Sequence, residues 1–186
     1  MAPSALPQMT HAAIYVWNLD RMSDFYQSVL GLVVSDQGRG MVFPADFVFL
    51  TADPEKHHQF VFVTGRAAGS PSTINQISFR VDTLAQIKDI AARAERAGTS
   101  SIRPLNHGNA LSVYIQDPEE NMIEVYLDTP WYINQPYSKP LDLSLSDEEI
   151  LARTEAMVRA EPSFMSRSAW MKIIAEKVRA SLAART

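Results

Sequence analysis

The feature that most constrains this chain is an internal repeat with an almost constant offset. Each half follows the order strand, helix and then three strands. Equivalent positions lie 65 residues apart: His11 matches Gln76 (76 − 11 = 65), and Phe25 matches Ile90 (90 − 25 = 65). Alternating apolar residues indicate strands, whereas apolar residues three or four apart indicate a helix. The repeat therefore predicts two copies of one β-α-β-β-β unit that share a core.

Turn and cap residues delimit the elements of each copy. The first copy predicts a helix with Asp20 as its N-cap and Gly31 after its end, and strands at 11–17, 32–35, 47–51 and 59–64. In the second copy Thr83 and Gln86 form a capping box and Gly98 ends the helix, with strands at 76–81, 101–103, 111–116 and 122–127. Residues 65–73, rich in Gly, Ala, Ser and Pro, form the linker.

The chain changes character after residue 128. Residues 129–140 hold three prolines and predict an extended strap whose Trp131, Tyr132 and Tyr137 pack on the core. Ser146 opens a helix with a second capping box, and an amphipathic helix follows from about Arg167 to Leu182. We thus expect an α+β fold, with two βαβββ modules (1–65 and 74–128) forming a cupped mixed sheet and a helical C-terminal extension (129–186).

Composition excludes several classes of protein and site. The chain has no cysteine, so disulfides, thiolate metal sites and cysteine nucleophiles are impossible. A net charge of −4 argues against nucleic acid as the partner. The first ten residues lack the pattern of a secretory signal, and no apolar run approaches the roughly 20 residues that span a bilayer. We expect a cytoplasmic protein with no membrane partner.

Three polar residues are predicted to meet on one face of the sheet. Strand alternation places His11 and Gln76 at equivalent positions on the face opposite the core. Glu124 lies in an otherwise apolar strand and matches Val61 of the first copy (124 − 61 = 63). A carboxylate there is costly unless it is paired, hydrogen-bonded or bound to a metal. One imidazole, one amide and one carboxylate form a partial shell for a divalent ion with open positions for substrate.

Each of these residues also has an ordinary explanation. A histidine near a strand start is more often a surface residue than a ligand, and a glutamine there is common. Glu124 alone is also explained as an edge-strand charge or as the partner of an arginine. Taken alone, the pair His57–His58 is better explained as a polar strand start, and His107 as a loop histidine. Only the repeat makes the first three residues converge.

Two stretches resemble the vicinal-oxygen-chelate superfamily, and most closely its extradiol ring-cleavage dioxygenases. Residues 107–124, H-G-N-A-L-S-V-Y-I-Q-D-P-E-E-N-M-I-E, resemble the dioxygenase signature, and residues 11–32 resemble the first module of many superfamily members. The similarity covers about residues 8–128. Leu105 and Glu120 depart from the usual pattern, because a smaller residue and Gly or Pro are common there.

The resemblance implies roles for individual residues. His11 and Glu124 match metal ligands, His58 matches the acid–base catalyst of the His-His pair, and His107 and Tyr114 match residues that orient the substrate. Gln76 stands in I-N-Q-I-S-F-R-V, where the dioxygenases have an iron-binding His. An amide oxygen is a harder and weaker donor than imidazole, although glyoxalase I enzymes use a Gln ligand.

The resemblance therefore implies a metal-dependent dioxygenase that cleaves a small aromatic diol with O2. Fe(II) is the expected cofactor, with Mn, Ni or Zn as alternatives because of Gln76. Two other functions remain open: a glyoxalase-like isomerase, and a metal-free protein that sequesters a small molecule. A homodimer is expected, since superfamily members commonly dimerise and the last helix carries a wide apolar stripe.

Overall fold

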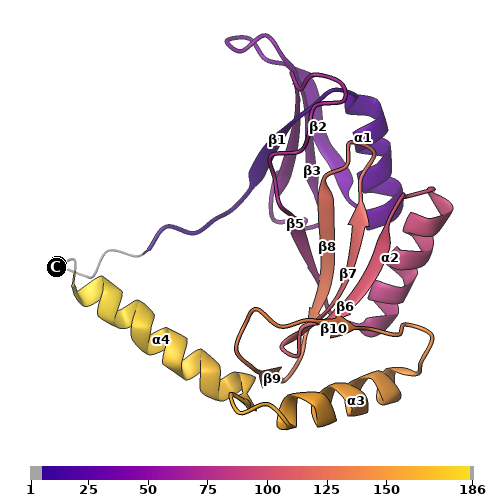
Figure 1. The fold of residues 1–186 in the computed structure, drawn as a ribbon. Coiled ribbons are helices and arrows are strands. Elements are labelled where there is room, and N and C mark those ends of the chain that lie inside the picture. Colours follow the sequence, from indigo (N-terminus) through magenta and orange to yellow (C-terminus); the bar gives the residue numbers. More distant parts are fainter. Residues whose placement is uncertain (1–5, 185–186) are drawn as a thin grey trace.

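The computed structural model describes residues 6–184, and it contains two βαβββ modules whose helices cover one side of their sheets (Figure 1). The first module comprises β1 (Ala12–Val16), α1 (Leu19–Phe25), the π-helical turn η1 (Tyr26–Leu30), β2 (Val33–Arg39), β3 (Asp46–Thr51) and β4 (Phe60–Thr64). The second comprises β5 (Ile77–Val81), α2 (Leu84–Arg96), β6 (Ile102–Asn106), β7 (Ala110–Gln116) and β8 (Met122–Asp128). The predicted α+β fold class is confirmed.

Strand register reproduces the repeat residue by residue. The first sheet has the order β1-β4-β3-β2, and the second has β5-β8-β7-β6 with the short β10 (Lys139–Pro140) beyond β6. In each module the first strand pairs in parallel with the last. Ala13 lies opposite Val61, and Ser78 lies opposite Glu124. The offsets between these two pairs are 78 − 13 = 65 for the first strands and 124 − 61 = 63 for the last strands. They equal the offsets found from the sequence.

Helix starts follow the capping chemistry, with one correction. The N-cap of α1 is Asn18, not Asp20: Asn18 has extended backbone, and its side-chain oxygen accepts a hydrogen bond from the Arg21 amide at 3.0 Å. Asp20 instead occupies the first turn, where a negative charge is favourable. Asn and Asp cap equally well, so their order in the chain could not decide between them. The capping boxes that open at Thr83 and Ser146 are both present.

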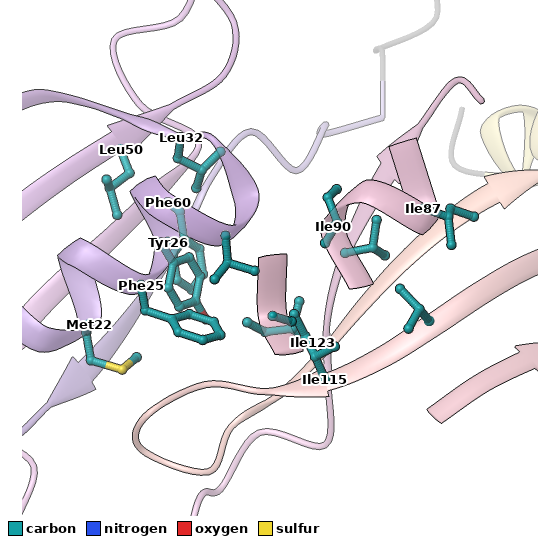
Figure 2. Close-up of a cluster of buried hydrophobic side chains, with 14 of the residues drawn as sticks. Met22, Phe25, Tyr26, Leu32, Leu50, Phe60, Ile87, Ile90, Ile115 and Ile123 are labelled. Atoms are coloured by element: carbon teal, nitrogen blue, oxygen red, sulfur yellow. The ribbon is translucent and has the colours of Figure 1, made fainter. Parts of the chain in front are cut away.

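A single apolar core lies between the helices and the two sheets (Figure 2). Tyr26 of η1 is fully buried at its centre, with its ring centroid 4.8 Å from that of Phe62 and 6.2 Å from that of Phe79 in the second module. Ile87 and Ile90 of α2 belong to the same cluster. Each fully buried side chain of this size contributes roughly 1.5–3 kcal/mol. The modules therefore stabilise each other.

Buried polar groups also join the modules. The turn between β7 and β8 inserts Glu119, whose Oε1 accepts hydrogen bonds from the backbone amides of Trp17 and Asn18, each at 2.8 Å. Arg66 lies 3.5 Å from Oε2. Burial raises the pKa of the Glu119 carboxyl, and the two amides and Arg66 oppose that shift. The end of β1 is thus completed by a residue of the second module.

The C-terminal extension comprises β9 (Trp131–Tyr132), β10 (Lys139–Pro140), α3 (Asp147–Arg159), β11 (Met165–Ser166) and α4 (Arg167–Ala183). Thr129 and Ile133 are the buried residues of the strap, whereas Trp131, Tyr132 and Tyr137 are half-buried. Figure 1 shows α4 projecting away from both modules, and it contains no buried residue. Within residues 6–184, no helix has the length and apolar character needed to cross a membrane.

Candidate active site

A buried carboxylate organises the open face of the second sheet, the face turned away from the helices. Glu124 of β8 is 8% exposed and accepts four hydrogen bonds from neighbouring side chains. Gln76 and Ser78 donate to Oε2 at 2.9 and 2.7 Å. Ser112 and Tyr114 donate to Oε1, both at 2.8 Å. Each carboxylate oxygen therefore has two donors, which offsets the cost of burying the charge.

Strand pairing explains why these donors converge. Ser78 is the parallel partner of Glu124 on β5, and Tyr114 is its antiparallel partner on β7. Gln76 and Ser112 lie two residues before these partners, and residues two apart on a strand point to the same face. The period of the strand places all four side chains beside the carboxylate.

A hydrogen-bonded chain leads from Glu124 to His107. The Nε2 atom of His107 lies 3.1 Å from the Tyr114 hydroxyl oxygen and 3.9 Å from Oε1 of Glu124. Burial, followed by the hydrogen bond to Glu124, raises the pKa of Tyr114 well above its ordinary value. The Tyr114 hydroxyl consequently keeps its proton at neutral pH and acts as a donor.

The chain borders an open cavity of about 410 Å³. Its lining is polar on most sides and combines β5, β7 and β8 with the β6–β7 loop and the strap: Ser78, His107, Asn109, Ala110, Tyr114, Glu124, Tyr126, Asp128 and Gln135. A substrate that enters here meets hydrogen-bonding groups of Glu124, Tyr114 and His107.

The other three histidines form a separate patch on the first module. His11 and His58 have ring centroids 4.5 Å apart, and Nδ1 of His57 lies 2.9 Å from Nδ1 of His58. His57 also faces Asp36 at 3.8 Å. Partial burial, then the neighbouring imidazoles of His11 and His57, lower the pKa of His58. His58 is therefore neutral at pH 7 and has a lone pair available to accept a proton.

The structure thus brings together part of the predicted site. Gln76, Glu124, Tyr114 and His107 form one cluster, and His11 and His58 belong to another. Among the described residues, no hydrogen bond or ion pair joins the two clusters. No group of three or more His, Asp or Glu side chains in residues 6–184 is arranged to hold a metal. Convergence of His11, Gln76 and Glu124 on one ion stays a prediction.

The chemistry of the donors fits a divalent cation on the side of the second module. Glu124 supplies carboxylate oxygens, and the Gln76 amide lies 2.9 Å away. A half-turn of the Gln76 amide would exchange the positions of its nitrogen and its oxygen. A cation bound by Glu124 would displace at least one of the four donors, and a turned Gln76 would present its oxygen instead. Carboxylate, amide oxygen and imidazole together suit Fe(II), Mn or similar ions.

Several residues of this region were not singled out from the sequence, among them Ser78, Ser112 and Gln135. Ser78 and Ser112 had a readable signal, because both lie at even spacing from predicted site residues on the same strand. Gln135 had none, since it reaches the site from the strap through tertiary packing alone.

Comparison with known proteins places the chain among its relatives. Residues 8–125 match the profile of the Glyoxalase/Bleomycin resistance protein/Dioxygenase superfamily. Biphenyl-2,3-diol 1,2-dioxygenase 2 of Rhodococcus globerulus is 27% identical over 130 residues, which cover 67% of this chain and 65% of that protein. The chain thus spans somewhat less than two thirds of this relative's length.

Solved structures agree on the fold. The glyoxylase/bleomycin resistance protein/dioxygenase domain from Frankia sp. EAN1pec superposes with a TM-score of 0.57 at 18% identity, covering 67% of this chain and 100% of that one. The fosfomycin resistance protein FosX from Listeria monocytogenes, solved with Mn(II) and sulfate, gives 0.52 at 16% identity, with 67% and 95% coverage. From the profile match, the strand register and the shared fold, the chain belongs to the Glyoxalase/Bleomycin resistance protein/Dioxygenase superfamily.

Proposed function

We propose that this protein is a metal-dependent extradiol-type dioxygenase that cleaves a catecholic ring with O2. The observation that carries the proposal is the chain Glu124–Tyr114–His107 at the cavity wall, with distances of 2.8 and 3.1 Å. The Tyr114 hydroxyl and the His107 imidazole, beside the buried carboxylate of Glu124, suit a substrate with two adjacent hydroxyls. One relative is named biphenyl-2,3-diol 1,2-dioxygenase. Its name describes a reaction on a diol of this kind, which supports the same proposal.

The residues divide the work by their chemistry. His11, Gln76 and Glu124 would hold Fe(II), which when bound supplies the electrons and the open positions for O2 chemistry. Tyr114 keeps its proton throughout the physiological range and would donate a hydrogen bond to a substrate oxygen in place of Glu124, its acceptor in this structure. His107 presents Nε2 toward the same region. His58, neutral because of its surroundings, accepts a substrate hydroxyl proton and later returns it.

The direct test is turnover by anaerobically purified, iron-loaded protein against several catechols, followed by the absorbance of the ring-cleavage product. His58→Gln should lower kcat by roughly 10²–10⁴-fold if His58 moves the proton. His57→Gln is the comparison variant: it removes the adjacent and more exposed imidazole, which contacts His58 and helps lower its pKa, so it should lower kcat far less than His58→Gln does. Absence of product from every catechol would contradict the proposal.

A metal-free binding protein is the second candidate, and one observation favours it. Glu124 is fully satisfied by four protein donors, so the buried charge needs no cation. Such a protein would retain no stoichiometric divalent metal after purification, and His11→Ala would leave its affinity for a small ligand unchanged. Metal analysis combined with calorimetry on both proteins separates the two candidates.

A further inference from the structure

The C-terminal extension encloses the loop that carries His107. The Thr129 hydroxyl donates to the Gly108 carbonyl at 2.6 Å, and Asn106 joins the loop to Thr154 of α3 at 2.8 Å. Ile133 packs against Gly108 so closely that a Cβ there would lie 2.6 Å from its Cδ1. The superfamily match ends at residue 125, so this enclosure is built by residues beyond it.

Gln135 connects the strap to His107 through both ends of its amide. Its nitrogen donates to the His107 carbonyl at 2.9 Å and to the Asn109 side-chain oxygen at 3.1 Å. Its oxygen accepts from the Tyr137 amide at 3.1 Å. This bridge holds the strap backbone at Tyr137 against the β6–β7 loop.

The position of Tyr137 determines where His107 carries its proton. The Tyr137 carbonyl oxygen lies 2.7 Å from Nδ1 of His107. A carbonyl oxygen only accepts hydrogen bonds, so Nδ1 of His107 carries a proton, and the neutral form that fits this contact is the Nδ1–H tautomer. The lone pair then lies on Nε2, which faces the Tyr114 hydroxyl.

We propose that the strap is part of the active site, and that Gln135 is a positioning residue. By holding the Tyr137 carbonyl beside His107, Gln135 fixes the Nδ1–H tautomer and keeps Nε2 as the acceptor that faces the cavity. The Tyr114 hydroxyl has one proton and then faces two acceptors, Oε1 of Glu124 at 2.8 Å and Nε2 of His107 at 3.1 Å, so it can donate to only one of them at a time. The kinetic consequence rests on the proposed function, whereas the tautomer does not.

The test reads the tautomer directly. Long-range ¹H–¹⁵N spectra of the full chain resolve its four histidines, and His107→Gln assigns the signal of His107. In the unaltered protein His107 should show a protonated Nδ1 and an unprotonated Nε2. Gln135→Ala should shift this signal toward a mixture of tautomers and lower kcat for ring cleavage about tenfold, as is typical when the partner of a site histidine is lost.

Two further variants sharpen the result. Gln135→Glu keeps the acceptor for the Tyr137 amide but sets a carboxylate against two oxygen acceptors, so it should disturb the tautomer as well. Asn134→Ala is the control, since Asn134 is exposed and within the described residues its side chain makes no hydrogen bond. The control should keep the tautomer and kcat of the unaltered protein.

Two outcomes would overturn the proposal: an Nε2–H tautomer in the unaltered protein, or an unchanged tautomer in both Gln135 variants. The first remains decisive even if the Gln135 variants fail to fold. If the tautomer behaves as expected but no catechol is cleaved, the positioning role stands and the proposed dioxygenase activity falls.

Discussion

The two modules share one register but differ in the chemistry of their open faces. In the first module Ala13 and Val61 are partners, and Val61 is buried under Phe47 and Phe49. In the second, the equivalent partners are Ser78 and Glu124, which are hydrogen-bonded at 2.7 Å. The helix-facing sides of both sheets contribute to one core, so packing constrains that side. The open face is therefore where the two copies were able to diverge.

The turns before β4 and β8 also differ, because equivalent aspartates in them have pKa values shifted in opposite directions. Asp53 and Asp117 are equivalent (117 − 53 = 64), and each accepts a hydrogen bond from the amide two residues on, at 3.0 and 2.9 Å. The hydrogen bond from the Glu55 amide lowers the pKa of the half-buried Asp53. Burial raises the pKa of Asp117, although four donors oppose it. Burial, more than the local hydrogen-bond geometry, therefore decides whether the carboxyl pKa is raised or lowered.

The largest expected effect comes from neutralising the acid that distinguishes the modules. Glu124→Gln places an amide N–H against side-chain donors and removes the charge, so we expect loss of bound metal and of turnover. The unpaired donors should also lower the free energy of unfolding by about 1–3 kcal/mol. Val61→Ala, at the equivalent position, should reduce stability without changing metal content. Equal metal content in both variants would remove Glu124 from the ligand set.

Crowding at the loop of the second module gives the next largest effect. Gly108 has φ 79°, and a Cβ there would approach Ile133 and Val158 within 2.6 and 2.9 Å. Both neighbours are buried, so Gly108→Ala should lower the free energy of unfolding by about 2–4 kcal/mol from strain and overpacking together. Gly69→Ala, with φ 73° and open space, should cost only about 1 kcal/mol. Urea titration measures both, and equal costs would argue against the tight enclosure.

Introducing an imidazole at residue 76 of the second module tests whether this position is a metal ligand. Gln76→His should tighten Fe(II) binding roughly tenfold, about 1.4 kcal/mol, because imidazole is the stronger donor. Competition with a coloured chelator measures the affinity. Unchanged or weaker binding would indicate that residue 76 is not a ligand.

A smaller effect, an increase in stability, should come from a substitution in the turn before β8. Glu120 has φ 64°, alone among the described non-glycine residues in being positive. Glu120→Gly should raise the free energy of unfolding by roughly 0.5–1 kcal/mol, since glycine adopts this conformation without strain. Lys56→Gly, at the equivalent position, should lower it slightly. The same sign for both variants would contradict this account.

The smallest effect is a difference between two titrations. Asp53, with a lowered pKa, stabilises the fold above its ordinary pKa, and this contribution disappears as pH falls through the folded value. Asp117, with a raised pKa, contributes most in acid and loses that contribution as pH rises through the folded value. Carboxyl ¹³C titration should therefore place the midpoint of Asp117 above that of Asp53. Coincident midpoints would mean that burial does not control Asp117.

The sequence predicted much of this because repeats and strand periods are local signals. The offset of 65 located β1 and β5, and an acid in an apolar strand identified Glu124 as unusual. Tertiary contacts limited the rest. The hydrogen bonds of Gln135 depend on how the strap folds back, which no local pattern encodes. The histidines illustrate the same limit, since alternation gives the face of His11 but not its distance from Glu124.

The carboxylate of Glu119 has a consequence for how the chain is made. Protein synthesis releases the first module long before residue 119, so the amides of Trp17 and Asn18 emerge without their acceptor. The Tyr26 hydroxyl likewise lacks its hydrogen-bond acceptor, 3.1 Å away, until Asp117 has been synthesised. A nascent N-terminal half would thus expose apolar surface and unsatisfied amides until the ribosome has translated beyond residue 119. Halves expressed separately should be dependent on each other for solubility.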